Sequence, residues 1–386
     1  MKRLLPLLAA LLLASCSDTL TLPDSPTRRT VIVYMMGENS LTQYAQGDLN
    51  EMRSATSLIP DSCRLVVFFD NSRSDINPEI LCLTKAQGES LQFEYSSDVI
   101  STDSATMLGA LRYMIEANPS DEYALVLWSH GSGWIPASAS NGSSRTIGID
   151  NGENTSSNTG QQMSIPTLRH VLEQAGAHWR YILYDACFMQ CVEVAYELRE
   201  LTDWSIGTPA ETPANGAAYD KLMPFLFEAE GYPKDIAEQY YEEYADNYGV
   251  VISAIRSSSL PLLATRTAAL LSPLDSFPLE GLQQYCAYAS QTGWKPEYYD
   301  IGSCMGAWLD EDAYQQWLSA LDEAVPYRYL SPSWVTSYSS VFRPRLTDQE
   351  HSVAVSMYVP QEGRDNYNAA WRQYEWYRDA AHKLDL

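Results

Sequence analysis

The sequence predicts an α/β fold with a mainly parallel central sheet, helices on both faces and a helical elaboration toward the C-terminus. Short apolar runs rich in β-branched and aromatic residues recur between residues 30 and 255, as is typical of strands buried on both faces of a parallel sheet. Helical patterns alternate with these runs, which favours parallel strand order. With 386 residues, 45% of them apolar and 19% charged, the chain can bury a large core.

The predicted elements alternate along the chain. The strands are expected at 30–36, 64–70, 79–84, 91–95, 123–130, 181–187, 204–207, 250–255 and 351–359. The helices are expected at 41–52, 104–117, 165–175, 218–228, 233–248 and 366–382. The segment 134–162 is rich in glycine, serine and asparagine and is predicted to be a long loop, whereas 260–342 is predicted to be helical and is rich in aromatic residues.

The first residues have the pattern of an export signal. Lys2 and Arg3 form a charged start, and the apolar run that follows is too short to span a bilayer. The run ends in Leu-Ala-Ser-Cys, which resembles a bacterial lipobox with cleavage before Cys16 and lipid on its sulfur. The alternative is a plain secretory signal in which Cys16 is incidental.

The chain is therefore predicted to be an exported lipoprotein, anchored to the bacterial envelope in the periplasm or at the cell surface. We expect a signal peptide over 1–15, a tether over 16–29 and one domain over 30–386, of which 260–342 is the helical elaboration. No other run approaches the ~20 apolar residues that a spanning helix needs.

Charge and cysteine content restrict the partners and sites. The formal net charge is −24, from 25 basic and 49 acidic residues, and the absence of a basic patch argues against nucleic-acid binding. The cysteines after Cys16 show no Cys-x-x-Cys spacing, and no metal site is predicted. Cys63 and Cys82 are candidates for a disulfide, a question that the sequence leaves open. We expect a monomer.

Two reactive side chains lie where predicted central strands end. His130 is the one histidine of five that ends a central strand against a glycine-rich loop, and Cys187 ends the next long apolar run. The carboxyl ends of parallel strands meet at one edge of a sheet, so the two residues are a candidate base and nucleophile. A helix expected to begin near Met189 would favour the thiolate. The N–H groups of Gly131 and Cys187 are candidates for an oxyanion hole.

These motifs closely resemble those of the clostripain-like cysteine peptidases, which belong with caspases, gingipains, separase and legumain in the caspase–haemoglobinase fold. The matching stretches are Trp-Ser-His-Gly at 128–131, Asp-Ala-Cys at 185–187, and the segments 33–35, 39–41, 148–150, 211–216 and 298–302. The resemblance implies a caspase-like α/β/α sandwich. It also implies that Cys187 is the nucleophile and His130 the general acid/base, with no third residue required.

The resemblance further implies cleavage after arginine or lysine. A carboxylate lies at the floor of the specificity (S1) pocket in this family, and Asp185 matches that position, although an acid there could also be structural. Glu211 is the nearest candidate for a second pocket acid. This chain has Gly216-Ala217 where the family usually has Gly-Trp, which puts the second acid, and so the strength of the basic preference, in doubt.

Some relatives are activated by cleaving themselves after a basic residue between the histidine and cysteine units. Arg145 is the candidate here, although it is equally suited to begin the strand expected at 146–150. No cofactor is predicted: calcium use occurs in the family, but no Asp-rich loop of this chain has the pattern of a calcium site.

The sequence also bears on two other functions. A serine hydrolase is disfavoured because no Gly-x-Ser-x-Gly elbow occurs in the chain. The remaining alternative is a catalytically silent lipoprotein of the same fold that binds peptides or glycans at the cell surface, for which the aromatic residues of 260–342 would be available.

Overall fold

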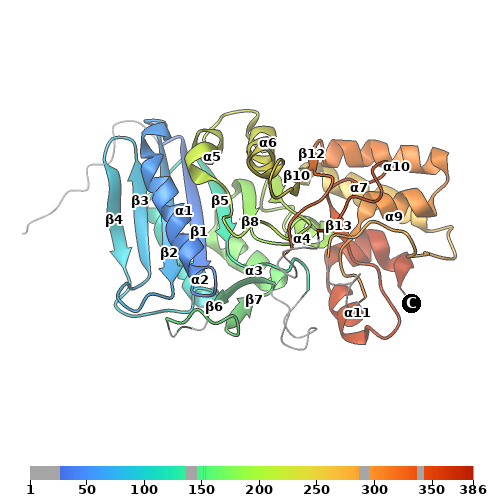
Figure 1. Ribbon diagram of the computed structural model, residues 1–386, viewed down its shortest axis with the longest axis horizontal. Helices are drawn as coiled ribbons and strands as arrows, with labels where there is room; N and C mark the ends of the chain where they lie inside the picture. Colours follow the sequence, from blue (N-terminus) through green and yellow to red (C-terminus); the bar gives the residue numbers. More distant parts are fainter. Residues whose placement is uncertain are drawn as a thin grey trace, which may run out of the picture.

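The structure, a computed structural model, describes residues 27–135, 146–150, 152, 154–286, 295–336 and 343–385. Its centre is a nine-stranded sheet in the order β12-β10-β9-β8-β5-β1-β2-β3-β4 (Figure 1). The five middle strands are parallel, and the strands at both edges are antiparallel to their neighbours. The predicted α/β class with a mainly parallel sheet is therefore confirmed.

The strands of the large sheet are β1 (Arg29–Gly37), β2 (Cys63–Asn71), β3 (Glu79–Thr84), β4 (Gly88–Glu94), β5 (Glu122–Trp128), β8 (Trp179–Asp185), β9 (Trp204–Gly207), β10 (Val251–Arg256) and β12 (Tyr327–Leu330). Two small pairs lie beside it: β6 (Ile147–Asp150) with β7 (Gln161–Met163), and β11 (Tyr299–Asp300) with β13 (Ser356–Met357). The edge strand β12 was not predicted, since its segment was expected to be helical.

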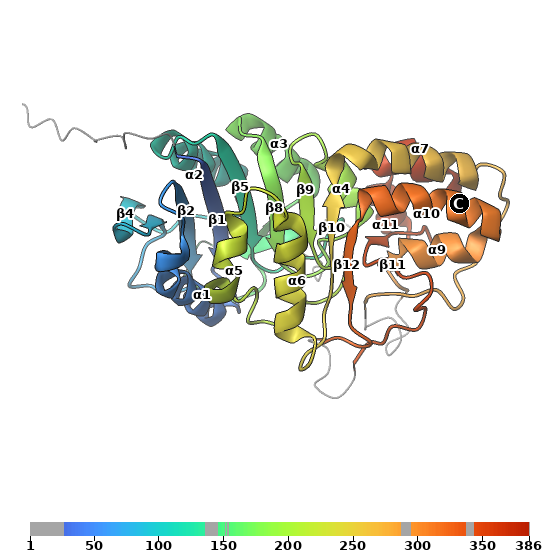
Figure 2. The same ribbon diagram turned by 90° about the horizontal axis from the view of Figure 1, so that it is seen from above.

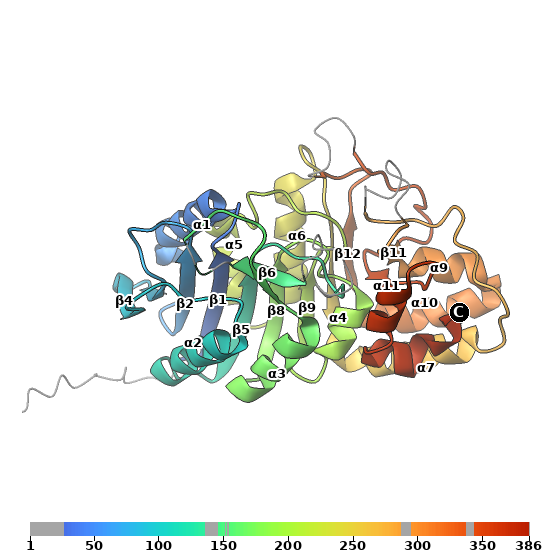
Figure 3. The same ribbon diagram turned by 90° about the horizontal axis from the view of Figure 1, so that it is seen from below.

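Helices cover both faces of the sheet, as Figure 2 and the opposite view in Figure 3 show. One face is covered by α1 (Thr42–Ser54), α5 (Tyr219–Leu226) and α6 (Tyr232–Tyr244). The other is covered by α2 (Ser104–Ala117), α3 (Ile165–Ala175), α4 (Val192–Glu197) and α7 (Leu260–Leu271). Each helix buries apolar side chains against strands that are apolar on both sides, so two cores sandwich the sheet.

The C-terminal helices lie beyond the β12 edge of the sheet (Figure 1). They are α9 (Ile301–Trp308), α10 (Glu311–Ala324) and α11 (Asp365–Trp371), and the short helical turns of the chain are η1 (Thr56–Leu58), η2 (Ser257–Ser259), η3 (Tyr377–Ala381) and η4 (His382–Leu384). Aromatic side chains fill this part: Trp317 and Trp334 are both 0% exposed. They belong to the core rather than to a binding surface.

Two expectations near the C-terminus are wrong. The strand expected at 351–359 is reduced to β13, because Asp348 accepts the His351 N–H and forms a turn there, and Ala354 adopts a left-handed backbone (φ 57°). The single helix expected at 366–382 is divided into α11, η3 and η4.

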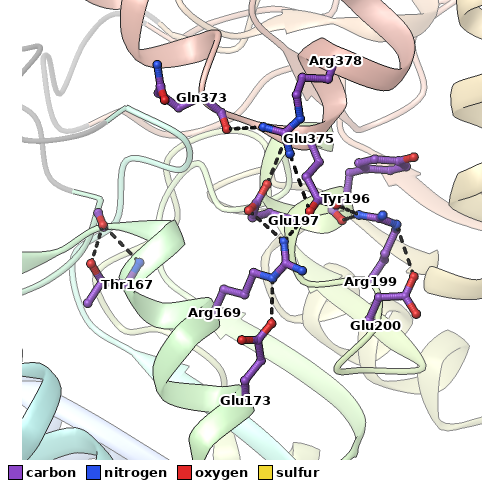
Figure 4. Close-up of polar contacts among 11 residues, drawn as sticks. Thr167, Arg169, Glu173, Tyr196, Glu197, Arg199, Glu200, Gln373, Glu375 and Arg378 are labelled. Carbon is purple, nitrogen blue, oxygen red and sulfur yellow. Dashed lines mark hydrogen bonds and ion pairs between the residues drawn. The ribbon is translucent and has the colours of Figure 1, made fainter.

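An ion network fastens this C-terminal segment to the sheet helices (Figure 4). Arg169 of α3 contacts Glu197 of α4 at 3.1 Å and Glu375 at 2.6 Å, and Arg199 contacts the other oxygen of Glu375 at 2.5 Å. Burial opposes ionisation of Glu375, but the hydrogen bonds from Arg169 and Arg199 outweigh it and lower the pKa of this carboxyl.

Two further questions from the sequence are answered. Cys63 and Cys82 are free thiols that point into the opposite cores of the sheet, so no disulfide joins them. Among the helices that the structure describes, none is both long and apolar enough to cross a membrane.

Candidate active site

The register of β5 and β8 brings the backbone at His130 level with the backbone at Cys187. The two strands are parallel neighbours, and Trp128 at the end of β5 pairs with Asp185 at the end of β8. His130 and Cys187 each follow two residues after these partners, so they leave adjacent strands at the same level. The Ser129 N–H extends the pairing by donating to the Asp185 carbonyl at 3.3 Å. Adjacent strand ends can hold a base within reach of a nucleophile.

Two glycines hold the loop after β5 against the turn that contains Cys187. A Cβ on Gly131 would lie 2.5 Å from the Cys187 carbonyl oxygen, and a Cβ on Gly133 would collide with the Phe188 carbonyl oxygen. Phe188 itself has a left-handed backbone (φ 61°), which is rare for a bulky residue, and its ring stacks on Tyr298 at 4.5 Å. Cys187 therefore lies on a tight, strained turn.

The turn is not followed directly by a helix, contrary to expectation. We expected helical structure from Met189, but α4 starts further along the chain and has only six residues. The reason is that the N–H groups of Phe188 and Gln190 donate to carbonyls of the segment 208–210, at 2.9 and 3.0 Å, so this backbone pairs with another segment instead of starting a helix. A helix dipole acting directly at Cys187 is therefore not part of the site.

Gly131 has its N–H directed away from the neighbouring β6 region. The Ser132 N–H and the His130 carbonyl, on either side of Gly131, form hydrogen bonds of 3.1 and 2.9 Å with the segment 146–148. Antiparallel pairing alternates, so the N–H between these two bonds points outward. It belongs to the same backbone that packs on Cys187, as an oxyanion hole requires.

The surroundings of Cys187 favour the neutral thiol. Its sulfur contacts the N–H of Thr212 at 3.4 Å and the Thr212 hydroxyl at 3.5 Å. Burial first, and then the charge of Glu211, raise the pKa of Cys187 to about 11, while the Thr212 contacts act in the opposite direction. At neutral pH the thiol is protonated in this conformation, so its deprotonation needs a base.

The imidazole of His130 contacts a serine from the loop after β1. The Ser40 hydroxyl lies 3.0 Å from His130 Nε2. Asn158 orients Ser40 from the other side: its side-chain oxygen accepts the Ser40 N–H at 3.1 Å, and its amide donates to the Ser40 hydroxyl at 2.9 Å. Ser40 is therefore a residue that positions the ring.

Asp185 is buried at the end of β8, with 4% of its surface exposed. One carboxylate oxygen accepts the Ala217 N–H at 2.9 Å and the Tyr219 hydroxyl at 3.0 Å, and the other accepts the Tyr240 hydroxyl at 3.3 Å. Burial raises the pKa of Asp185, and these three donors oppose the shift.

A second buried acid lies near it. Asp48 of α1 accepts the Trp128 indole N–H at 2.6 Å, and a Cβ on Gly216 would touch both the Asp185 and the Asp48 carboxylates, at 2.7 and 3.0 Å. Burial, and then the charge of Asp185, raise the pKa of Asp48 to about 9. The two acids form a compact pair behind Gly216.

The structure thus brings most of the predicted residues into one place. Gly131 packs on Cys187, Asp185 lies two residues before it, and Glu211 is a buried acid whose charge acts on it. Arg145 and Cys16 lie outside the described residues. Sequence reasoning gave no role to Ser40, Thr212 or Asp48, although the first two lie in stretches that match the family.

Comparisons with known proteins show the family of the chain. The model of the clostripain family, Peptidase_C11, matches residues 33–382. A secreted C11 cysteine protease from Bacteroides thetaiotaomicron, solved with an irreversible peptide inhibitor, is 31% identical, with a TM-score of 0.80 over 92% of this chain and 98% of that one. An inactive zymogen C11 protease from Parabacteroides distasonis is 27% identical, with a TM-score of 0.78 over 92% of this chain and 99% of that one. No curated protein matches the chain significantly.

The fold, together with these relatives, defines a cysteine peptidase with a caspase-like architecture. More particularly, the chain belongs to the clostripain family, because the family model spans nearly all of the residues after the N-terminal segment.

Proposed function

We propose that this chain is an endopeptidase that hydrolyses peptide bonds after arginine or lysine, with Cys187 as nucleophile and His130 as general acid and base. The observation that supports this most directly is the β5–β8 register, which sets both residues at the ends of adjacent parallel strands. Gly131, which must be a glycine to fit against Cys187, adds the backbone N–H of an oxyanion hole.

In this mechanism the proton and the sulfur move together. The thiol of Cys187 is neutral before reaction, so His130 accepts its proton as the sulfur attacks the scissile carbonyl. The carbonyl oxygen becomes negative and receives hydrogen bonds from the N–H groups of Gly131 and Cys187. His130 then gives the proton to the leaving amine, and a water molecule, activated by the same imidazole, hydrolyses the thioester.

Asp185 and Glu211 are the proposed acids of the S1 pocket. Asp185 lies two residues before the nucleophile and holds two tyrosine hydroxyls, and Glu211 is near enough to shift the thiol pKa. A cationic P1 side chain, the one just before the cleaved bond, would offset both negative charges and so lower the thiol pKa as it binds. Specificity and activation of the nucleophile are then coupled.

The neutral thiol also fits a protein that awaits activation. One similar structure is described as an inactive zymogen, and we propose that this chain matures by cleavage after Arg145. We also propose, from its N-terminal segment, that the chain is exported and attached by lipid at Cys16. Labelled palmitate should be incorporated into the wild-type protein and should not be incorporated into Cys16→Ala.

The specificity is tested with fluorogenic peptides that differ only at P1, assayed with wild type, Cys187→Ala and Asp185→Asn, with intact masses recorded on the same samples. We expect turnover of arginine and lysine peptides by wild type only, and a loss in kcat/KM for Asp185→Asn that is confined to basic P1 residues. Equal losses on every P1 residue would refute the pocket role of Asp185. If wild-type protein that has already been cleaved after Arg145 turns over none of the peptides, the result would support the alternative, a catalytically silent protein that binds peptides or glycans.

A further inference from the structure

The loop 208–217 places one residue, Thr212, against the sulfur of Cys187. The Thr212 N–H donates to that sulfur at 3.4 Å, and the Thr212 hydroxyl oxygen lies 3.5 Å from the same atom. Thr212 belongs to no helix or strand, so its N–H is not taken up by regular secondary structure. Two polar groups of a single residue therefore converge on the sulfur of the proposed nucleophile.

The loop is fastened at both ends, which fixes the position of Thr212. At its start, the carbonyls of residues 208 and 210 accept N–H groups from the residues just after Cys187, at 3.0 and 2.9 Å. At its end, the Ala217 N–H donates to the Asp185 carboxylate at 2.9 Å, and the preceding carbonyl accepts a tyrosine hydroxyl from α6. Donors that are held in place before a charge develops need no reorganisation when it does.

We propose that Thr212 is a catalytic residue whose backbone N–H and hydroxyl together stabilise the thiolate of Cys187. The inference rests on Cys187 being the nucleophile, as proposed above. When the thiol gives its proton to His130, negative charge develops on the sulfur, and both groups then form charge-assisted hydrogen bonds with it. A hydroxyl can accept as well as donate, so the same group accepts the S–H of the resting thiol and turns to donate once the proton has left.

The same two donors act again at the end of the reaction. Hydrolysis of the thioester breaks the bond between carbon and sulfur and leaves the electron pair on the sulfur of Cys187. The sulfur departs as a thiolate before it regains a proton from the His130 imidazole, so stabilisation by Thr212 favours this step as well.

The other neighbours of the sulfur oppose the thiolate, which gives these two donors their importance. Burial first, then the charge of Glu211 and, more weakly, that of Asp185, raise the pKa of Cys187. Burial and the charge of Asp185 also raise the pKa of Tyr240, so this neighbour stays neutral. Among the described residues, Thr212 supplies the contacts that lower the pKa of the thiol.

The test is the rate at which iodoacetamide alkylates Cys187 between pH 7 and 9, followed on its own peptide by mass spectrometry with the intact mass of each chain recorded. Thr212→Val keeps the shape and the N–H but loses the hydroxyl, which should lower the thiolate fraction about 10- to 100-fold. Each remaining thiolate is more nucleophilic because its pKa is higher, so the net expectation is alkylation about 3- to 10-fold slower than in wild type. The other described cysteines are buried, so they interfere little.

Two further variants separate stabilisation of the thiolate from simple access to it. Thr212→Ala loses bulk together with the hydroxyl, so it should be alkylated as slowly as Thr212→Val, whereas a residue that only restricts access would give a rate equal to or above that of wild type. Thr212→Ser keeps both donors and should stay within about twofold of wild type.

The matched control is Thr265→Val, the same change on an exposed threonine of α7 whose hydroxyl donates to the Pro261 carbonyl. It should be alkylated at the wild-type rate. A wild-type rate in Thr212→Val or Thr212→Ala, or a Thr212→Ser protein as slow as Thr212→Val, would overturn the proposal. Failure of the peptidase assay would leave this result unaffected, since no turnover is measured.

Discussion

The contact between Gly131 and the Cys187 carbonyl gives the sharpest mutational prediction. A Cβ at position 131 would lie 2.5 Å from that oxygen, whereas real Cβ atoms essentially never come closer than 3.0 Å, so Gly131→Ala must separate the two backbones by about half an ångström or more. The Gly131 N–H then no longer faces the developing oxyanion. Loss of one such donor costs roughly 10²–10³-fold in kcat, and we expect that loss with KM changed only a few-fold.

Two measurements make this prediction specific. Alkylation of Cys187 by iodoacetamide passes through no oxyanion, so its rate should change far less than kcat. The control is Gly109→Ala in α2, where a Cβ meets nothing within 4 Å; this variant should retain full activity and gain about 0.5–1 kcal/mol of stability. A Gly131→Ala enzyme with normal kcat, or one whose alkylation falls as far as its turnover, would refute the assignment of this N–H.

Three further predictions concern charges and contacts around the site and at the C-terminus. Glu211→Gln removes a charge that raises the pKa of the Cys187 thiol. The pH profile of iodoacetamide alkylation should therefore move to lower pH, with a several-fold faster rate at pH 8. An unmoved profile would show that Glu211 does not act on the sulfur. Ser40→Ala should lower kcat about 10-fold with the melting temperature unchanged, because it frees the His130 ring, and a normal kcat would contradict this role. Glu375→Gln should lower the free energy of unfolding by about 1–3 kcal/mol at pH 7, as measured in urea titrations. Because the pKa of Glu375 is lowered in the folded protein, the difference in unfolding free energy between wild type and variant should shrink as the pH falls from about 4.5 through that lowered value. A pH-independent difference would exclude the ion network as its cause.

The placement of His130 and Cys187 at the ends of adjacent strands was predictable because it depends on elements whose pattern is local. His130 and Cys187 each end an apolar run, and parallel strand ends must meet, so sequence alone indicated their proximity. The glycine after His130 was expected to let the backbone approach a substrate carbonyl. The close approach that the structure shows is to the Cys187 carbonyl, because a Cβ at position 131 would lie 2.5 Å from its oxygen.

Other parts of the site were not predictable, because they depend on contacts between distant segments. The Ser40–His130 contact spans 90 residues, and the Cys187–Thr212 contact joins two loops. The helix expected at Met189 failed because backbone pairing with the segment 208–210 outcompetes local helical propensity.

The edge strand β12 was missed for the same reason: its residues have no strong strand pattern, and pairing with β10 decides their conformation.

Labelling with an arginine chloromethyl ketone tests the central claim most directly. The reagent places a guanidinium in the S1 pocket and an electrophile at the nucleophile, and its site is read by peptide mass mapping of wild type, His130→Ala and Asp185→Asn. We predict one label per chain on Cys187, formed at least tenfold faster than with the matched norleucine reagent, slowed by His130→Ala, and without the arginine preference in Asp185→Asn. Labelling of another cysteine, or equal rates for the two reagents on wild type, would contradict a Cys187–His130 peptidase that is specific for basic residues.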